Sequence, residues 1–225
     1  MEPIFLQKQE FSHPQKTGPS RHTLSEVFPN TVTDAAALGY VLSCLPRTGA
    51  PILWVQDRLS ARETGRPYLA GIGAGRPVIT IDLSRPIDVL WALENGLRCH
   101  TLAAVIGELW GDPTAVDFTA TKRLALRSEA SNVPCWLIRH AATPNLSAAR
   151  ARWRIGSAPA APHPHDQQAP GMPRWSLDLF RAHHARPAKW TVTYDRTTDR
   201  VDQLPPLRNR EVGARDGEAR QRTGR

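Results

Sequence analysis

The sequence has no long apolar run, since no stretch reaches the roughly 18 residues that a membrane-spanning helix needs. It also lacks the charged start, apolar segment and small-residue cleavage site of a secretory signal peptide. We therefore expect a soluble, cytoplasmic protein with no membrane segment. A chain of 225 residues is long enough for one ordinary domain with extensions.

Cysteine is scarce. The three cysteines, Cys44, Cys99 and Cys135, each stand alone on an apolar segment, without a CxxC pair or a matching histidine pair. Disulfide frameworks need paired cysteines, and zinc sites need closely spaced Cys and His ligands. The sequence therefore predicts neither disulfides nor a metal site, and we expect the three thiols to be buried.

Lysine is also rare, because the 29 basic residues are all arginine except Lys8, Lys16, Lys122 and Lys189. The net charge of +8 is unevenly distributed along the chain. Residues 121–190 contain 11 basic and 3 acidic residues, whereas the remainder contains 18 of each sign. A basic region of this kind is typical of a surface that binds nucleic acid or an acidic partner.

Apolar strands alternate with amphipathic helices over the first two thirds of the chain. Runs rich in β-branched residues predict strands at 24–28, 51–55, 77–83, 102–109 and 135–139. Helices are predicted after a cap at Thr31 or Thr33, from Pro86, and from Pro113 with Asp112 as its cap. Residues between the second and third strands form a polar, glycine-rich connection. This alternation predicts an α/β fold with a mainly parallel sheet flanked by helices.

The pattern changes near residue 150. Short strands without intervening helices are predicted at 150–155, 175–180 and 189–195, and we expect them to add antiparallel strands to one edge of the sheet. The proline-rich segment 156–173 predicts a loop. The domain therefore spans residues 22–195. It is preceded by a weakly ordered arm (1–21) and followed by a charged tail (196–225) with few apolar residues to bury.

The turn after the first strand lacks the residues that bind phosphate. Residues 29–36 read PNTVTDAA and lie between a strand and a helix, where many α/β proteins hold a nucleotide. A phosphate loop uses glycines to bring backbone N–H groups to the phosphates and a lysine to balance their charge. This turn has neither, and Asp34 would repel a triphosphate. We therefore predict no nucleotide cofactor and no catalytic activity.

The order of elements over residues 22–195 resembles the core of the RecA recombinase. HTLSEVF (22–28) resembles the strand before the phosphate loop, and AVIGELWGDP (104–113) resembles the Walker B strand. SNVPCWLIRHA (131–141) resembles the strand that leads to the second DNA-binding loop. The resemblance implies a RecA-like core with a degenerate phosphate loop.

Three further strings resemble the ImuA family of damage-inducible mutagenesis proteins. They are LWVQDRLSARETGRPY (53–68), GELWGDP (107–113) and DFTATKRLALRSEASNVP (117–134). This resemblance implies a noncatalytic accessory protein of the SOS response and translesion DNA synthesis. The implied partners are an ImuB-like polymerase homologue and an error-prone DnaE-type polymerase, with RecA and single-stranded DNA as further candidates.

Two departures from RecA argue against autonomous filaments. The segments at its DNA-binding loops are short here, and the first 21 residues are too few for its oligomerising arm. Two other functions stay open. One is a SulA-like inhibitor of cell division, since SulA-type proteins are similar RecA-like domains without a phosphate loop. The other is an NTPase that uses an unrecognised site.

Two polar residues at predicted strand ends are weighed as catalytic groups. Glu108 occupies the position of a Walker B acid, but without a phosphate loop it has no substrate to act on. His140 lies where RecA-like proteins place a nucleotide-sensing residue, although a single histidine at a strand end is more typical of a hydrogen-bonded surface group. We therefore assign no catalytic residue. Apolar surroundings also predict core positions for Trp54, Trp91, Trp110 and Trp136.

The segment ARARWRI places three arginines on one strand face. At a period of two, Arg150, Arg152 and Arg154 point to one side, while Trp153 and Ile155 point to the other. Arginine suits phosphate, so we interpret this face as a candidate nucleic-acid or partner-binding site. The neighbouring predicted helix adds candidate binding residues at Lys122, Arg123 and Arg127. The alternative is a solvated edge strand whose charges prevent aggregation.

Overall fold

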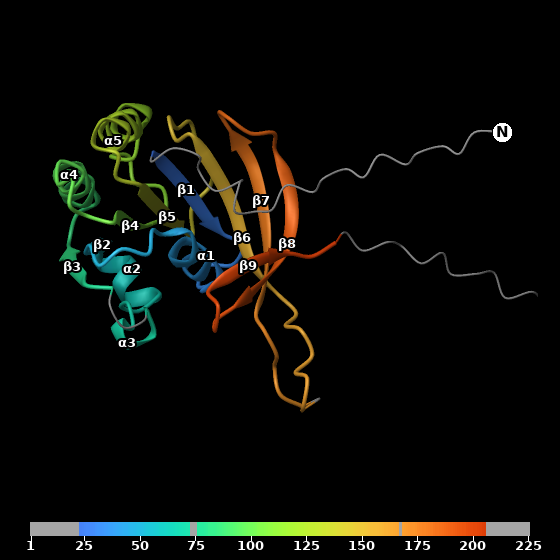
Figure 1. The fold of residues 1–225 in the computed structure, drawn as a ribbon. Helices are drawn as coiled ribbons and strands as arrows, with labels where there is room; N and C mark the ends of the chain where they lie inside the picture. Colours follow the sequence, from blue (N-terminus) through green and yellow to red (C-terminus); the bar gives the residue numbers. More distant parts are fainter. Residues whose placement is uncertain (1–22, 73–75, 167, 206–225) are drawn as a thin grey trace, which may run out of the picture.

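The computed structural model describes residues 23–72, 76–166 and 168–205. They form one nine-stranded sheet with the strand order β3-β2-β4-β5-β1-β6-β7-β8-β9 (Figure 1). None of the described helices is long and apolar enough to cross a membrane. The predicted arm at 1–21 and residues 206–225 of the predicted tail lie outside the described residues.

The parallel part of the sheet contains six strands. They are β1 (Leu24–Pro29), β2 (Ile52–Asp57), β3 (Val78–Leu83), β4 (Ala104–Trp110), β5 (Cys135–His140) and β6 (Ala151–Ala158). All six residues of β2 and of β5 are buried, as expected for strands covered on both faces. The predicted α/β fold with a mainly parallel sheet is confirmed.

The C-terminal strands extend the sheet with antiparallel pairing. They are β7 (Arg174–Ala182), β8 (Ala188–Asp195) and β9 (Arg200–Gln203). The prediction for 150–155 needs one correction, because β6 is parallel to β1 and only its other edge pairs antiparallel, with β7. The sheet also continues past residue 195, since β9 pairs with β8 within the region assigned to the tail.

Five helices flank the sheet. They are α1 (Ala36–Cys44), α2 (Arg58–Glu63), α3 (Leu69–Ile72), α4 (Pro86–Gly96) and α5 (Phe118–Ser131). One core lies between α1 and the sheet and contains Trp54, Trp136 and Trp153. A second core lies under α4 and α5 and contains Leu93, Leu124 and other aliphatic side chains. The sheet is therefore covered on both faces, with α4 and α5 on one side (Figure 1).

Several local predictions were wrong. The helix predicted from Pro113 begins at Phe118, because Asp117 rather than Asp112 caps it by accepting a hydrogen bond from Ala120 N at 2.7 Å. The α1 helix has no side-chain cap from Thr31 or Thr33. The polar connection between β2 and β3, for which no element had been assigned, contains the two short helices α2 and α3.

The predicted burial failed at Trp91 and Cys99, and Trp110 and Cys44 are only half-buried. Trp91 is 69% exposed on α4, although Trp54 and Trp136 are buried as predicted. Cys99 is exposed, whereas Cys135 is buried and its burial raises the pKa of the thiol to about 12. Both exposed side chains lie on or just after α4, whose opposite face packs on the sheet.

Candidate functional site

The turn where a phosphate loop would lie is occupied by the protein's own carboxylate. Asp34 Oδ1 accepts a hydrogen bond from Ala36 N, at the start of α1, over 2.9 Å. From the end of β6, Ser157 donates through its backbone N to Oδ2 and through its Oγ to Oδ1, both at 2.7 Å. An internal anion therefore takes the backbone donor and the position that a phosphate would use at a helix start.

The same turn is held against β6. Asn30 N donates to Ile155 O at 2.8 Å, and the Asn30 amide donates to Ser176 Oγ at 3.3 Å. Gly156 permits this approach, because a Cβ there would lie 2.3 Å from Asn30 Nδ2. Burial alone would raise the pKa of Asp34, but the hydrogen bonds from Ser157 and Ala36 outweigh it and lower that pKa. The carboxylate is thus held in its charged form.

Glu108, which the resemblance to RecA suggested as a Walker B acid, is buried and enclosed by hydrogen-bond partners. Trp54 Nε1 donates to Glu108 Oε1 at 2.5 Å, and Gln56 Nε2 donates to the same oxygen at 3.1 Å. His140 Nε2 lies 2.7 Å from Glu108 Oε2, and the ring of Trp110 stacks on that of His140. These residues come from three neighbouring strands, β2, β4 and β5, and the hydrogen bonds connect them. The carboxylate is engaged in internal contacts, which is the geometry of a structural polar cluster.

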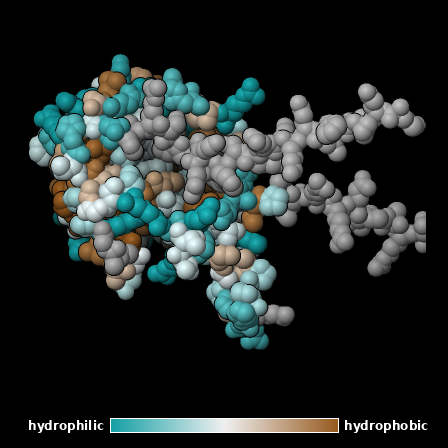
Figure 2. Space-filling model, in the orientation of Figure 1, coloured by the Kyte–Doolittle hydropathy of each residue, from teal (hydrophilic) through white to brown (hydrophobic). Residues whose placement is uncertain are grey.

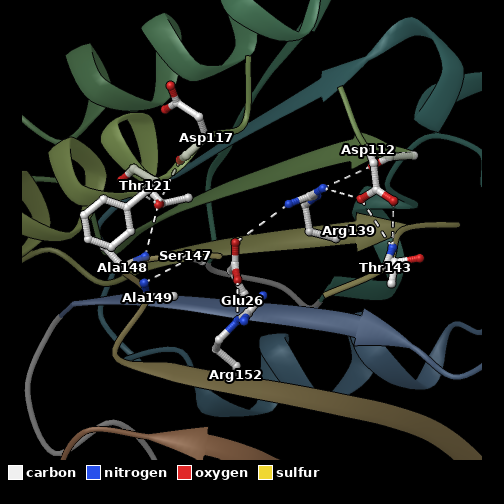
Figure 3. Close-up of polar contacts among 12 residues, drawn as sticks. Glu26, Asp112, Asp117, Thr121, Arg139, Thr143, Ser147, Ala148, Ala149 and Arg152 are labelled. Carbon is white, nitrogen blue, oxygen red and sulfur yellow. Dashed lines mark hydrogen bonds and ion pairs between the residues drawn. The ribbon is translucent and has the colours of Figure 1, made fainter. Parts of the chain in front are cut away.

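A buried ion network lies in the middle of the sheet (Figure 3). Arg152 Nε donates to Glu26 Oε2 at 2.7 Å, and Arg139 Nη1 lies 3.8 Å from Glu26 Oε1. Arg139 Nη2 also donates to Asp112 Oδ1 at 2.9 Å. Burial lowers the pKa of Arg139, Glu26 and Asp112 oppose that effect, and Arg152 adds to it. Glu26, Arg139 and Arg152 therefore depend on one another for charge compensation, because they are buried away from water, whereas Asp112 is 43% exposed.

The connection between β5 and β6 is fastened to the same region (Figure 3). Thr143 N donates to Asp112 Oδ2 at 3.0 Å, and Ala148 N donates to Thr121 Oγ1 of α5 at 3.1 Å. Ala149 N donates to Ser147 Oγ at 3.1 Å, and Ser147 is buried. The connection between β5 and β6 is thus tightly anchored in this chain.

The structure separates the three arginines of the predicted cationic face. Trp153 and Ile155 are buried in the core on the α1 side, which confirms the predicted alternation. Arg152 is only 4% exposed and pairs with Glu26, so its assignment to an open cationic surface is wrong. Arg150 pairs with Glu129 at 2.7 Å, and Arg154 is 3.8 Å from Asp178 and covers the ring of Phe180 at 4.4 Å. Arg154 is the most exposed of the three, with 46% of its side chain accessible.

The three candidate basic residues of α5 also do not form one surface with the arginines at β6. Arg123 and Arg127 both pair with Glu94 on α4, at 3.2 and 3.7 Å. Glu129, on the same helix, pairs instead with Arg150 beside β6. The two arginines therefore face α4 and do not join the arginines of β6, whereas Lys122 is exposed.

In residues 23–72, 76–166 and 168–205, no group of three His, Cys, Asp or Glu side chains is placed to hold a metal ion. The polar groups that do converge are hydrogen-bonded to one another around Asp34, Glu108 and Glu26. Such an arrangement stabilises a fold and orients its elements.

Comparison with known proteins gives the family. No protein-family model matches the chain. The chain is 31% identical over 176 residues to Protein ImuA from two strains of Caulobacter vibrioides, and the alignment covers 71% of this chain and 68% of each relative. The chain belongs to the ImuA family. Membership of the ImuA family implies a role in damage-induced mutagenesis, and the predicted family resemblance is confirmed.

The ion network of this ImuA family member was not predicted from the sequence. The sequence does contain an indication of it, because Glu26 and Arg139 are single charged residues inside the apolar strands LSEVF and CWLIR. A charge in the middle of a buried strand requires a partner. The sequence could not show that these residues meet Arg152, which is 126 positions from Glu26.

Proposed function

We propose that this ImuA family member is a noncatalytic adaptor of translesion DNA synthesis. It binds an ImuB-like polymerase homologue and an error-prone DnaE-type polymerase and brings them together. The observation that carries this proposal is the Asp34 carboxylate, which takes the place of a phosphate at α1. The buried partners of Glu108 support it further, because they leave that acid no access to a substrate.

The exposed apolar side chains favour binding through an interface. Six of the large exposed hydrophobic residues come from residues 59–91, on α2, α3, β3, α4 and the connection before α3: Leu59, Tyr68, Leu69, Ile79, Ile87 and Trp91. β3 is an edge strand, so one side of its backbone has no strand neighbour in the described sheet. Hydrophobic residues are visible on this side of the surface in Figure 2. Exposed apolar residues beside a free strand edge are typical of a protein interface.

We further propose that the basic side chains provide a second contact surface. Lys122, Arg123, Arg127 and Arg154 are exposed, and Arg150 is less so. Each of these arginines lies near a carboxylate. Exposed pairs of this kind contribute little stability and can exchange partners at small cost. A phosphate backbone or an acidic partner surface would recruit them. RecA and single-stranded DNA are the candidate ligands for this surface.

Capture of the ImuB-like protein tests the adaptor proposal. We expect Trp91→Glu and Ile79→Glu to abolish capture, because each places a charge in the apolar surface around β3. Leu126→Glu is the matched control for Ile79→Glu, since Leu126 is 50% exposed against 49% for Ile79 but lies on α5. Equal capture by all variants would show that the partner binds elsewhere. Capture of the division protein FtsZ in place of the ImuB-like protein would support a SulA-like inhibitor instead.

A further inference from the structure

A cavity of about 620 Å³ lies between α1, α3 and the turn that joins β8 to β9. Its size falls in the range of about 300 to 1,000 Å³ that is typical of small-molecule sites. None of its lining residues belongs to the turn at 29–36, so the cavity is separate from the blocked phosphate position. Its apolar lining includes Leu42 and Ile72.

The charged lining of the cavity is mostly cationic. Arg47, Arg76 and Arg196 contribute guanidinium groups, and Asp199 is the single acid among the lining residues. Arg47 and Arg76 both pair with Asp199 Oδ2, and Tyr194 Oη donates to Asp199 Oδ1 at 2.5 Å. Arg196 has no ion pair within the described part of the chain. The cavity therefore keeps an excess of positive charge after its internal pairs are counted.

Arg76 is held in place at the edge of this cavity. Its Nη1 donates to Leu42 O at 3.1 Å, and its side chain is only 14% exposed. Burial lowers the pKa of Arg76, and the nearby charge of Arg47 lowers it further. Asp199 neutralises only part of this positive charge, and a bound anion would further offset the repulsion between the two guanidinium groups. The site thus combines one largely buried arginine, Arg76, with the more exposed Arg47 and Arg196.

We propose that this cavity binds a small phosphate-bearing molecule. Its phosphate contacts Arg47, Arg76 and Arg196, and its organic part lies against Leu42 and Ile72. Phosphate is favoured because guanidinium forks bind its oxygens in a bidentate manner. Hydroxyl groups of Thr48 and Thr197 also line the cavity and supply neutral donors. This binding site is independent of the adaptor proposal, because it requires no partner protein.

Calorimetric titration of the full chain with inorganic pyrophosphate tests the site. Gly49 lines the cavity, a Cβ there would meet no atom within 4 Å, and its φ is not positive. Gly49→Glu should therefore keep the fold and weaken pyrophosphate binding about tenfold or more through like-charge repulsion. Gly49→Lys is the matched control, with similar bulk and the opposite charge, and should bind at least as tightly as the unaltered chain.

A second pair of variants locates the contact. Arg196→Gln should weaken pyrophosphate binding about tenfold, the effect of one lost charge-assisted contact. Arg62→Gln is its control, because Arg62 is exposed on α2 and pairs only with Glu63. Tighter binding of AMP than of inorganic phosphate would support the role of the apolar lining. Failure of the unaltered chain to bind pyrophosphate, or equal binding by Gly49→Glu and Gly49→Lys, would overturn the proposal.

Discussion

Arg152 Nε lies 2.7 Å from Glu26 Oε2, and both side chains are almost completely buried between neighbouring strands β6 and β1. The guanidinium also lies 5.4 Å from the ring centroid of Phe28 and 5.3 Å from that of Phe180. Because of this ion pair, Arg152, which the sequence predicted to bind phosphate, is part of the core. Its neighbour Arg154, two positions along the strand, stays accessible to a ligand.

Arg152→Met should lower the free energy of unfolding by about 3 to 5 kcal/mol, because it leaves the Glu26 carboxylate buried beside only the more distant Arg139. Arg154→Met should change it by less than about 0.5 kcal/mol, since that side chain is exposed. Urea denaturation measures both. Adding Glu26→Gln to Arg152→Met should recover part of the loss. Equal stability of the two single variants would show that the buried pair does not support the fold.

Asp34→Asn should destabilise the protein by about 1 kcal/mol at neutral pH, because the amide cannot accept all three hydrogen bonds. The pKa of Asp34 is lowered below 3.8 in the folded protein. Its charge therefore stabilises the fold fully above that ordinary value, and the contribution is lost as pH falls through the folded pKa. Urea denaturation across the acidic range should show the two proteins converging below pH 3.8. A constant difference at every pH would contradict the role assigned to this charge.

Glu108→Ala should lower stability by about 1 to 3 kcal/mol, because Trp54, Gln56 and His140 lose a buried hydrogen-bond partner. The same change should leave capture of the ImuB-like protein intact once the variant is folded, since Glu108 has no access to a partner. Thermal unfolding and capture at low temperature separate the two effects. Loss of capture by a well-folded variant would point to a functional role for this acid.

We also propose that the folded domain ends near residue 203, with extensions on both sides. Limited proteolysis should remove residues 1–21 and the segment after 205 first, leaving a stable product that contains the nine-stranded sheet. Mass spectrometry of the product defines its ends. Early cleavage within 24–203, other than in the proline-rich loop, would show that the domain is placed wrongly.

The sequence predicted the strands and the main helices well, because apolar runs and helical periods depend on local neighbours. Alternation in ARARWRI correctly placed Trp153 and Ile155 in the core. It could not show that the opposite face is also covered near Arg152, since Glu26 and Phe28 come from a distant part of the chain. The position of Asp34 indicated repulsion of a triphosphate, but its bonds to Ser157 depend on how β6 packs beside β1.

The most direct test of the central claim is reconstitution of the complex from purified components by size-exclusion chromatography. An adaptor should bring the ImuB-like protein and the DnaE-type polymerase into one peak, and this peak should form equally well with and without ATP and Mg²⁺. Omitting the chain should leave the two polymerases in separate peaks or in a weaker complex. A complex that forms equally well without the chain, or that forms only with hydrolysable ATP, would contradict a noncatalytic adaptor.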